Sequence, residues 1–120
     1  MKNKKDLGAL GENLAEALLR KRGYKILEKN FRSRFGEIDI VAQDLETLVF
    51  VEVKTRWNRQ FGSPEESVGP HKIRLIEKTG QYFRLTHPGL PEAERIDVVA
   101  IEMEEDGKII REELIKNAAF

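Results

Sequence analysis

The apolar positions of this chain change period several times, and each change predicts a structural element. Four leucines recur at helical spacing near the N-terminus: Leu7, Leu10, Leu14 and Leu18. Gly23 follows them as a stop signal, which predicts a first helix over residues 6–22. Three strand-like segments come next, over residues 24–31, 35–43 and 47–55. Their short connections are typical of an antiparallel meander.

The second half of the chain alternates a helix with two strands. A loop rich in turn residues, in which Ser63-Pro64 begins a short capped turn, leads to a helix predicted over residues 70–85. "RIDVVAIEM" then predicts a buried strand, and Asp106-Gly107 signals a hairpin into a last strand over residues 109–114. The order α-β-β-β-α-β-β contains a strand–helix–strand crossover after a meander. We therefore expect an α/β fold, with a mixed β-sheet flanked by helices.

Length and composition narrow the class of protein. A chain of 120 residues fits one domain, so we expect residues 1–120 to form a single unit. The absence of cysteine excludes disulfides, thiolate nucleophiles and cysteine metal sites, and suits a reducing compartment. The N-terminal segment becomes amphipathic rather than uniformly apolar, and no stretch reaches the length of a membrane span. We expect a cytoplasmic protein without membrane contact.

A net charge of zero conceals an uneven distribution. Residues 1–84 hold 17 Lys and Arg against 12 Asp and Glu, whereas residues 85–120 hold 4 against 9. The basic excess is densest in "RKRGYKILEKNFRSR", a stretch that can follow a phosphate backbone. Charge alone favours the simpler interpretation of a solvated surface.

Two neighbouring strands carry the candidate chemistry. Side chains alternate along a strand, which gives each of these strands an aliphatic and a charged face. The aliphatic sets are Ile38, Ile40 and Ala42 on one strand and Val49, Val51 and Val53 on the next. The opposite sets are Glu37, Asp39 and Val41, and Phe50, Glu52 and Lys54. Pairing of the two strands can place Asp39 beside Glu52 and Lys54, in a register that the sequence leaves open.

Two carboxylates forced together repel, and one normally takes up a proton unless a cation removes the conflict. Oxygen ligands suit Mg²⁺ or Mn²⁺, and Lys54 beside such an ion can stabilise developing negative charge or help deprotonate water. This is hydrolytic chemistry on a phosphodiester. An isolated Glu-x-Lys is more often a cross-strand ion pair on a solvated face. The hypothesis therefore depends on Asp39 in the preceding strand.

These residues carry a resemblance to a known group of proteins. "GEIDIVA" and "LVFVEVKTR" resemble the D…(D/E)-x-K signature of the PD-(D/E)xK nuclease superfamily, which includes type II restriction enzymes and archaeal Holliday-junction resolvases. Ile38 stands where the literal signature has proline, a departure that many members share. Over nearly its whole length the chain more closely resembles the YraN family of small bacterial proteins, through "LGALGENLAEALLRKRGYKILEKNFRSRFGEIDIVA", "VFVEVKTR", "FGSPEESV" and "RIDVVAI".

The resemblance implies a restriction-endonuclease-like fold and a DNA endonuclease that uses Mg²⁺ or Mn²⁺, with branched or otherwise structured DNA as its substrate. It implies that Asp39, Glu52 and the backbone carbonyl of Val53 bind the metal, and that Lys54 is the catalytic lysine. Resolvase-like members add a glutamate from the first helix, and Glu12 falls at that place. A solvent-facing helix carboxylate is an equally good interpretation of Glu12. The resolvase-like members also suggest a homodimer, which would join two basic surfaces across one DNA.

Other residues near these strands have weaker claims. Four bases are predicted to contact DNA phosphates: Arg32, Arg34, Arg56 and Lys72. Glu37 can extend the metal site or pair with an arginine, and Ser63 can touch a phosphate or cap a helix. For Lys72 we favour a solvated helix charge over a phosphate contact. For Trp57 we favour packing, and for Asp97 a buried structural hydrogen bond, over roles in function.

Three functions stay open at this point. The first is the metal-dependent nuclease. The second is a nucleic-acid-binding module on the same fold with little or no cleavage, and the third is an interaction subunit that docks through its acidic C-terminal third. The combination of Asp39, Glu52 and Lys54 favours the first, because a pure binder has no need of clustered carboxylates that repel phosphate. Zero net charge argues against tight sequence-independent binding by a monomer.

Overall fold

One mixed sheet with the strand order β1-β2-β3-β4-β5 organises the chain. The structure, a computed structural model, describes residues 4–57 and 62–118. Its elements follow the predicted order α-β-β-β-α-β-β, with a short 3-10 helix added before the second α-helix. They are α1 (Lys4–Lys21), β1 (Lys25–Ser33), β2 (Gly36–Asp44), β3 (Thr47–Arg56), η1 (Pro64–Ser67), α2 (Pro70–Thr86), β4 (Ala93–Met103) and β5 (Ile109–Ile115).

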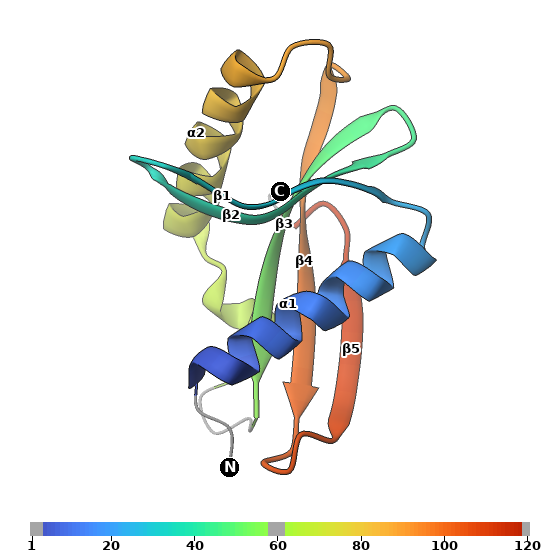
Figure 1. Ribbon diagram of the computed structural model, residues 1–120. Helices are drawn as coiled ribbons and strands as arrows, with labels where there is room; N and C mark the ends of the chain where they lie inside the picture. Colours follow the sequence, from blue (N-terminus) through green and yellow to red (C-terminus); the bar gives the residue numbers. More distant parts are fainter. Residues whose placement is uncertain (1–3, 58–61, 119–120) are drawn as a thin grey trace.

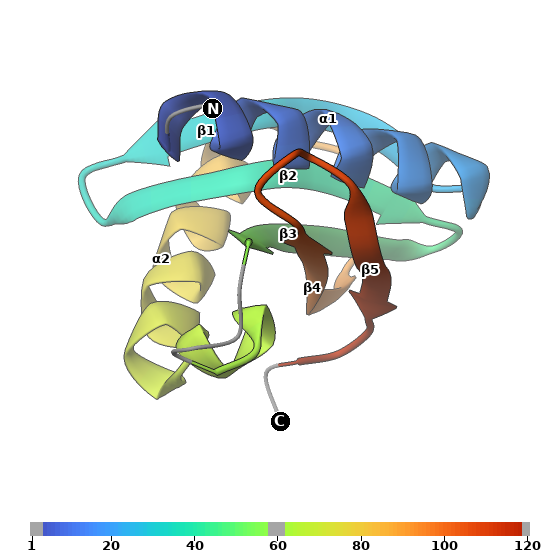
Figure 2. The ribbon, with the colours of Figure 1, turned by 90° about the horizontal axis from the view of Figure 1, so that it is seen from below.

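The sheet combines a meander with one crossover, as predicted. β1, β2 and β3 pair antiparallel, β3 and β4 pair parallel, and β5 returns antiparallel to β4. The parallel pair needs a long connection, which α2 supplies. Figures 1 and 2 show α1 and α2 on opposite faces of the sheet. Two separate apolar clusters result, one under each helix.

Helix α1 packs on the sheet through a narrower face than its leucines predicted. Leu7 is buried as expected, but the fully buried side chains further along are Ala15 and Leu19, and the other three predicted leucines are half-buried on either side. The chain leaves the helix at Gly23, whose φ of +89° allows the backbone N–H of Tyr24 to donate to the Leu19 carbonyl at 2.9 Å. Two small residues, Gly11 and Ala15, allow α1 to lie close to β3.

The inward face of α2 combines bulky apolar residues with one glycine. Ile76, Gly80 and Phe83 are buried, and Ile73 packs at the edge of the same cluster. A Cβ at Gly80 would overlap the ring of Phe50 on β3, so glycine is needed for the helix to approach the sheet. Within the described ranges, no helix is both long and apolar enough to cross a membrane.

Strand β2 departs from the predicted alternation at Asp39. Ile40 and Ala42 lie in the cluster under α1, whereas Ile38 lies with Val41 in the cluster under α2. The pairs Lys29↔Ile40 and Phe31↔Ile38 place Asn30 opposite Asp39, and Asn30 adopts a left-handed φ of 54°. A residue in the left-handed region interrupts the alternation of side chains along a strand. Ile38 and Ile40, which are two residues apart, therefore point to opposite faces of the sheet.

A polar network closes the C-terminal end of the chain onto β4. Asp97 is fully buried and accepts hydrogen bonds from the Tyr24 hydroxyl (2.8 Å), Arg95 Nε (2.9 Å) and the Asn117 backbone N–H (3.0 Å). Arg95 also donates to Asp44 Oδ2 at 2.7 Å. The structural role predicted for Asp97 agrees with these contacts. Residues 117 and 118 are bonded to β4, since the Ala118 backbone N–H also donates to the Ile96 carbonyl at 2.7 Å.

Candidate active site

The candidate site lies where β2 and β3 stop pairing through their backbones. The ladder between them runs from Asp44↔Thr47 to Ile40↔Val51. At Asp39, the residue before Ile40, a side chain replaces the backbone as the partner of β3. Its Oδ2 accepts a hydrogen bond from the backbone N–H of Val53 at 2.7 Å. Val53 is the residue whose carbonyl the resemblance assigns to the metal. The bond fixes the Val53 backbone beside the Asp39 carboxylate.

The surroundings of Asp39 favour the protonated form of its carboxyl group. Burial raises the pKa of the Asp39 carboxyl to about 7, and the neighbouring Glu52 carboxylate pushes the pKa in the same direction. The hydrogen bond from Val53 opposes this shift, while Glu12 and Glu37 add smaller upward contributions to the pKa. Four carboxylates from α1, β2 and β3 are therefore close enough to interact. The structure brings together all four of the acids that the sequence singled out.

Glu52 is the most buried of these acids, with 3% of its surface exposed. Its Oε2 lies 3.2 Å from Lys54 Nζ and 3.6 Å from Lys72 Nζ. Lys72 comes from the first turn of α2, which the β3–β4 crossover brings to the same face as Glu52. The sequence predicted Lys72 only as a phosphate contact. Its position beside Glu52 depends on where the crossover helix docks, and no local pattern carries that information.

Glu12 reaches the site because α1 lies close to β3. A Cβ at Gly11 would overlap the hydroxyl of Thr55, so the glycine allows the helix to approach just before Glu12. With its amide nitrogen toward the carboxylates, Asn30 donates to Oε1 of Glu12 (3.0 Å) and to Oε1 of Glu37 (2.8 Å). Sequence reasoning missed Asn30. Its one available signal was an asparagine, a residue tolerant of left-handed backbone, inside an otherwise regular strand.

The predicted phosphate contacts are distributed around the site. Arg32 is exposed and its Nε donates to Glu37 Oε2 at 3.0 Å. Arg34 lies at the β1–β2 turn, and Arg56 donates to the neighbouring Thr55 carbonyl at 3.1 Å. Ser63 precedes η1, where its backbone N–H donates to Glu66 Oε2 at 2.8 Å, which accounts for its capping role. Trp57 packs against the cluster under α1, as expected.

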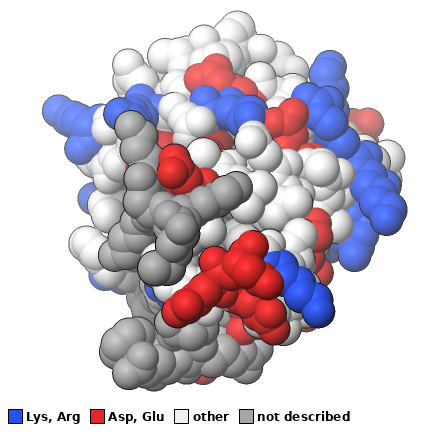
Figure 3. Space-filling view, turned by 60° about the horizontal axis from the view of Figure 1, so that its bottom comes forward, with Lys and Arg blue, Asp and Glu red and all other residues white. Residues whose placement is uncertain are grey.

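The surface carries charges of both signs. Figure 3 shows an acidic cluster low on the visible face, basic side chains along its right side, and further side chains of both signs elsewhere. The turn between β4 and β5 contributes Glu104, Glu105 and Asp106, all exposed. Of the acids in the C-terminal third, these three lie exposed at the β4–β5 turn, whereas Asp97 and Glu102 are buried.

The donor set suits a hard divalent cation in its chemistry. Carboxylate oxygens are the ligands that Mg²⁺ and Mn²⁺ prefer, and a cation would remove the repulsion that raises the pKa of Asp39. Within residues 4–57 and 62–118, however, no three His, Asp or Glu side chains converge on one point in metal-binding geometry. Asp39 Oδ2 is bonded to Val53 and Glu52 Oε2 to two lysines. Binding therefore requires a small rearrangement of these side chains.

Comparison with known proteins identifies the family. The model of the uncharacterised protein family UPF0102 matches residues 11–101. This chain belongs to that family. The match confirms the YraN resemblance, and it covers α1 from Gly11 onward and every strand that contributes to the site.

Individual relatives extend the similarity to nearly the whole chain. A UPF0102 protein of Syntrophomonas wolfei is 50% identical over 105 residues, which is 87% of this chain and 90% of that protein. A UPF0102 protein of Caldicellulosiruptor bescii is 46% identical over 117 residues, 97% of this chain and 98% of that protein. A UPF0102 protein of Syntrophus aciditrophicus is 47% identical over 111 residues, which is 92% of this chain and 86% of that protein.

Proposed function

We propose that this UPF0102 protein is a metal-dependent nuclease that hydrolyses phosphodiester bonds in DNA, with branched or otherwise structured DNA as its substrate. One observation carries the proposal: Glu12, Glu37 and Glu52 surround Asp39 in a half-buried place where their charges oppose one another. This repulsion raises the free energy of the ionised form of Asp39. The resemblance of "GEIDIVA" and "LVFVEVKTR" to the PD-(D/E)xK signature gives the same residues a catalytic use.

Asp39 and Glu52 would hold the cation, with the Val53 carbonyl beside them and Glu12 reaching in from α1. When bound, Mg²⁺ or Mn²⁺ supplies positive charge to the scissile phosphate and lowers the pKa of water. Lys54 presents its ammonium group next to Glu52, where it can stabilise negative charge on a phosphate oxygen. Lys72 adds a second ammonium group from α2 on the same carboxylate.

Cation binding is the first test. Mg²⁺ and Mn²⁺ are titrated at pH 8 by calorimetry and thermal shift into the wild type, Asp39→Asn, Glu52→Gln and the control Glu46→Gln. The control makes the same chemical change at the exposed turn of the β2–β3 hairpin. Saturable binding is expected in wild type and control only, and at 100 times the dissociation constant it stabilises the fold by about 2.7 kcal/mol. Absence of binding in the wild type, with and without DNA, contradicts the proposal.

A nucleic-acid-binding module without cleavage is the second candidate. It is favoured by the lack of converging metal ligands in the described part of the chain and by the two lysines already paired with Glu52. Junction, flap and nicked DNA separate the two candidates. For a nuclease, Glu52→Gln abolishes cleavage and preserves DNA binding. For a binding module, the wild type binds and does not cleave with either cation.

A further inference from the structure

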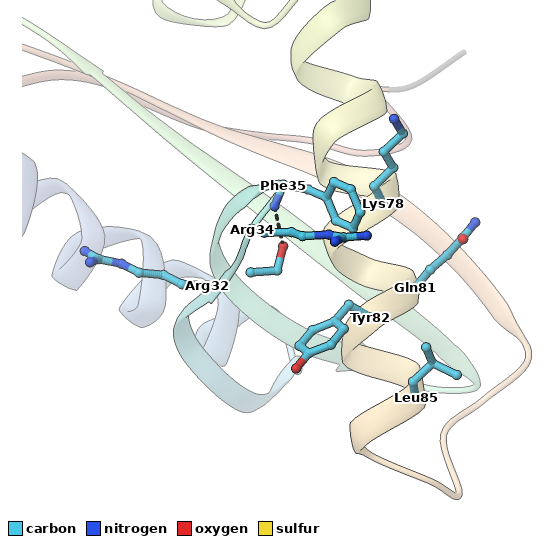
Figure 4. Close-up of a pocket in the computed structure, with 8 residues that line it drawn as sticks. Arg32, Arg34, Phe35, Lys78, Gln81, Tyr82 and Leu85 are labelled. Carbon is cyan, nitrogen blue, oxygen red and sulfur yellow. Dashed lines mark hydrogen bonds between the residues drawn. The ribbon is translucent and has the colours of Figure 1, made fainter.

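A cleft of about 650 Å³ lies between the β1–β2 turn and the C-terminal half of α2. Figure 4 shows the residues that line it, contributed by these two elements. They are Arg32, Ser33, Arg34, Phe35, Lys78, Gln81, Tyr82 and Leu85. Neither the carboxylate chemistry nor the packing of the core explains why this cleft combines aromatic with basic side chains.

The β1–β2 turn itself is unusual in its residues. Arg34 and Phe35 form the two-residue connection, a place where glycine, asparagine and aspartate dominate. The Arg34 guanidinium lies 4.9 Å from the centroid of the Phe35 ring, and Lys78 Nζ lies 5.6 Å from it. One aromatic ring is therefore flanked by two cations, and it stays partly exposed. Across the cleft, Tyr82 is 45% exposed.

Aromatic surface beside cations is the combination that binds unpaired nucleotides, because bases stack on rings while cations neutralise the backbone. Arg34 and Lys78 supply positive charge, while Arg32 is paired with Glu37, and none of the described residues lining the cleft is acidic. We propose that this cleft binds unpaired nucleotides of a DNA strand, with Phe35 and Tyr82 as the stacking surfaces. The inference rests on the proposed function and narrows its substrate to DNA with a single-stranded segment next to the cut.

The cleft and the carboxylates lie close enough for one DNA strand to contact both. Arg32 lines the cleft and also pairs with Glu37, a neighbour of Asp39. Helix α2 connects the two places as well, since Lys72 contacts Glu52 and Lys78 lines the cleft. The step of six residues from Lys72 to Lys78 rises about 9 Å along the helix, a length that a few nucleotides of one DNA strand cover.

The test is fluorescence anisotropy in EDTA with a labelled oligothymidylate of about ten nucleotides and a blunt duplex hairpin. The variants Tyr82→Leu, Phe35→Ala and Arg34→Ala are compared with Arg22→Ala, which removes one exposed charge beyond the end of α1. Loss of a stacking ring is expected to weaken oligothymidylate binding roughly 5- to 150-fold. Tyr82→Phe, which keeps the ring, is expected to bind like the wild type. Circular dichroism shows which variants are folded.

Three results would overturn the inference. The first is that Tyr82→Leu and Arg34→Ala bind oligothymidylate no more weakly than Arg22→Ala. The second is an equal loss of duplex binding, which makes the cleft a general electrostatic surface. The third is equally tight binding of a polyglutamate peptide, which makes the partner an acidic protein segment. Oligothymidylate binding is measured in EDTA and requires neither a cation nor cleavage, so failure of the nuclease proposal and failure of this one give different results.

Discussion

The sequence contains two nearly identical pentapeptides, "IDIVA" at residues 38–42 and "IDVVA" at residues 96–100, and their aspartates have opposite environments. Asp97 is fully buried and accepts from a hydroxyl, a guanidinium and a backbone N–H. Asp39 accepts one backbone N–H and faces other carboxylates. The same local pattern therefore gives a fully hydrogen-bonded aspartate, Asp97, in β4. In β2 it gives Asp39, whose charge is opposed by neighbouring carboxylates, an arrangement called electrostatic frustration. Frustration of this kind is the feature that points to function.

The largest effect is expected at Asp97. Replacing Asp97 by Asn removes the charge that holds Arg95 and turns one acceptor into a donor facing other donors. Breaking a buried charge pair typically costs about 3–5 kcal/mol, so Asp97→Asn should lower the free energy of unfolding by that amount. Urea denaturation at pH 7 measures the change. A loss below about 1 kcal/mol would mean that the network contributes little to stability.

The same substitution at Asp39 is expected to act in the opposite direction. Its pKa of about 7 lies above the unfolded value of 3.8, so the native state holds more protons between about pH 4 and 7. The free energy of unfolding therefore falls as pH rises through that window. Asn cannot ionise and keeps an oxygen for the Val53 N–H. Asp39→Asn should therefore stabilise the metal-free protein at pH 8 by at most about 4 kcal/mol, and leave it unchanged at pH 4.

Urea denaturation in EDTA at the two pH values measures this difference, with Glu46→Gln as the control for loss of one exposed charge. If Asp39→Asn is less stable than the wild type at pH 8, Asp39 is a structural group like Asp97 and the comparison fails.

The smallest expected effects are on the pKa of Asp39 itself. Glu52→Gln and Glu12→Gln each remove one repelling carboxylate, so each should lower this pKa, with the larger decrease from Glu52 because its influence is stronger. Carbon-13 NMR titration of the Asp39 carboxyl follows both. Glu77→Gln, an exposed position on α2, should leave the titration unchanged. An unchanged pKa in Glu52→Gln would place the two carboxylates too far apart to share a cation.

Much of this architecture could be predicted from sequence, because the elements are set by local periodicity. The alternation of Val49, Val51 and Val53 with Phe50 and Glu52 placed the apolar and charged faces of β3 correctly. On β2 the same reasoning failed at Ile38, because the left-handed Asn30 belongs to the opposing strand. Alternation within one strand carries no information about a backbone turn imposed by its neighbour.

From strand geometry, the site was predictable only as far as its residues are close in sequence, and Glu12 was assigned through the family resemblance alone. Asp39, Glu52 and Lys54 belong to one hairpin, so strand geometry alone suggested their proximity. Lys72 and the aromatic cleft depend on the docking of α2, and Asn30 depends on the register of β1. These positions follow from packing between distant segments, which a motif does not specify.

The contacts of the two aspartates also differ in how far apart along the chain their partners lie. The Asp39–Val53 bond closes a loop of 14 residues, whereas the Tyr24–Asp97 bond joins residues 73 apart. Short loops close at lower entropic cost and earlier in folding than long ones. The β2–β3 hairpin can thus form with Asp39 already in place, before β4 joins the sheet. We therefore expect the local contact of Asp39 to form early in folding and the long-range contact of Asp97 to form late.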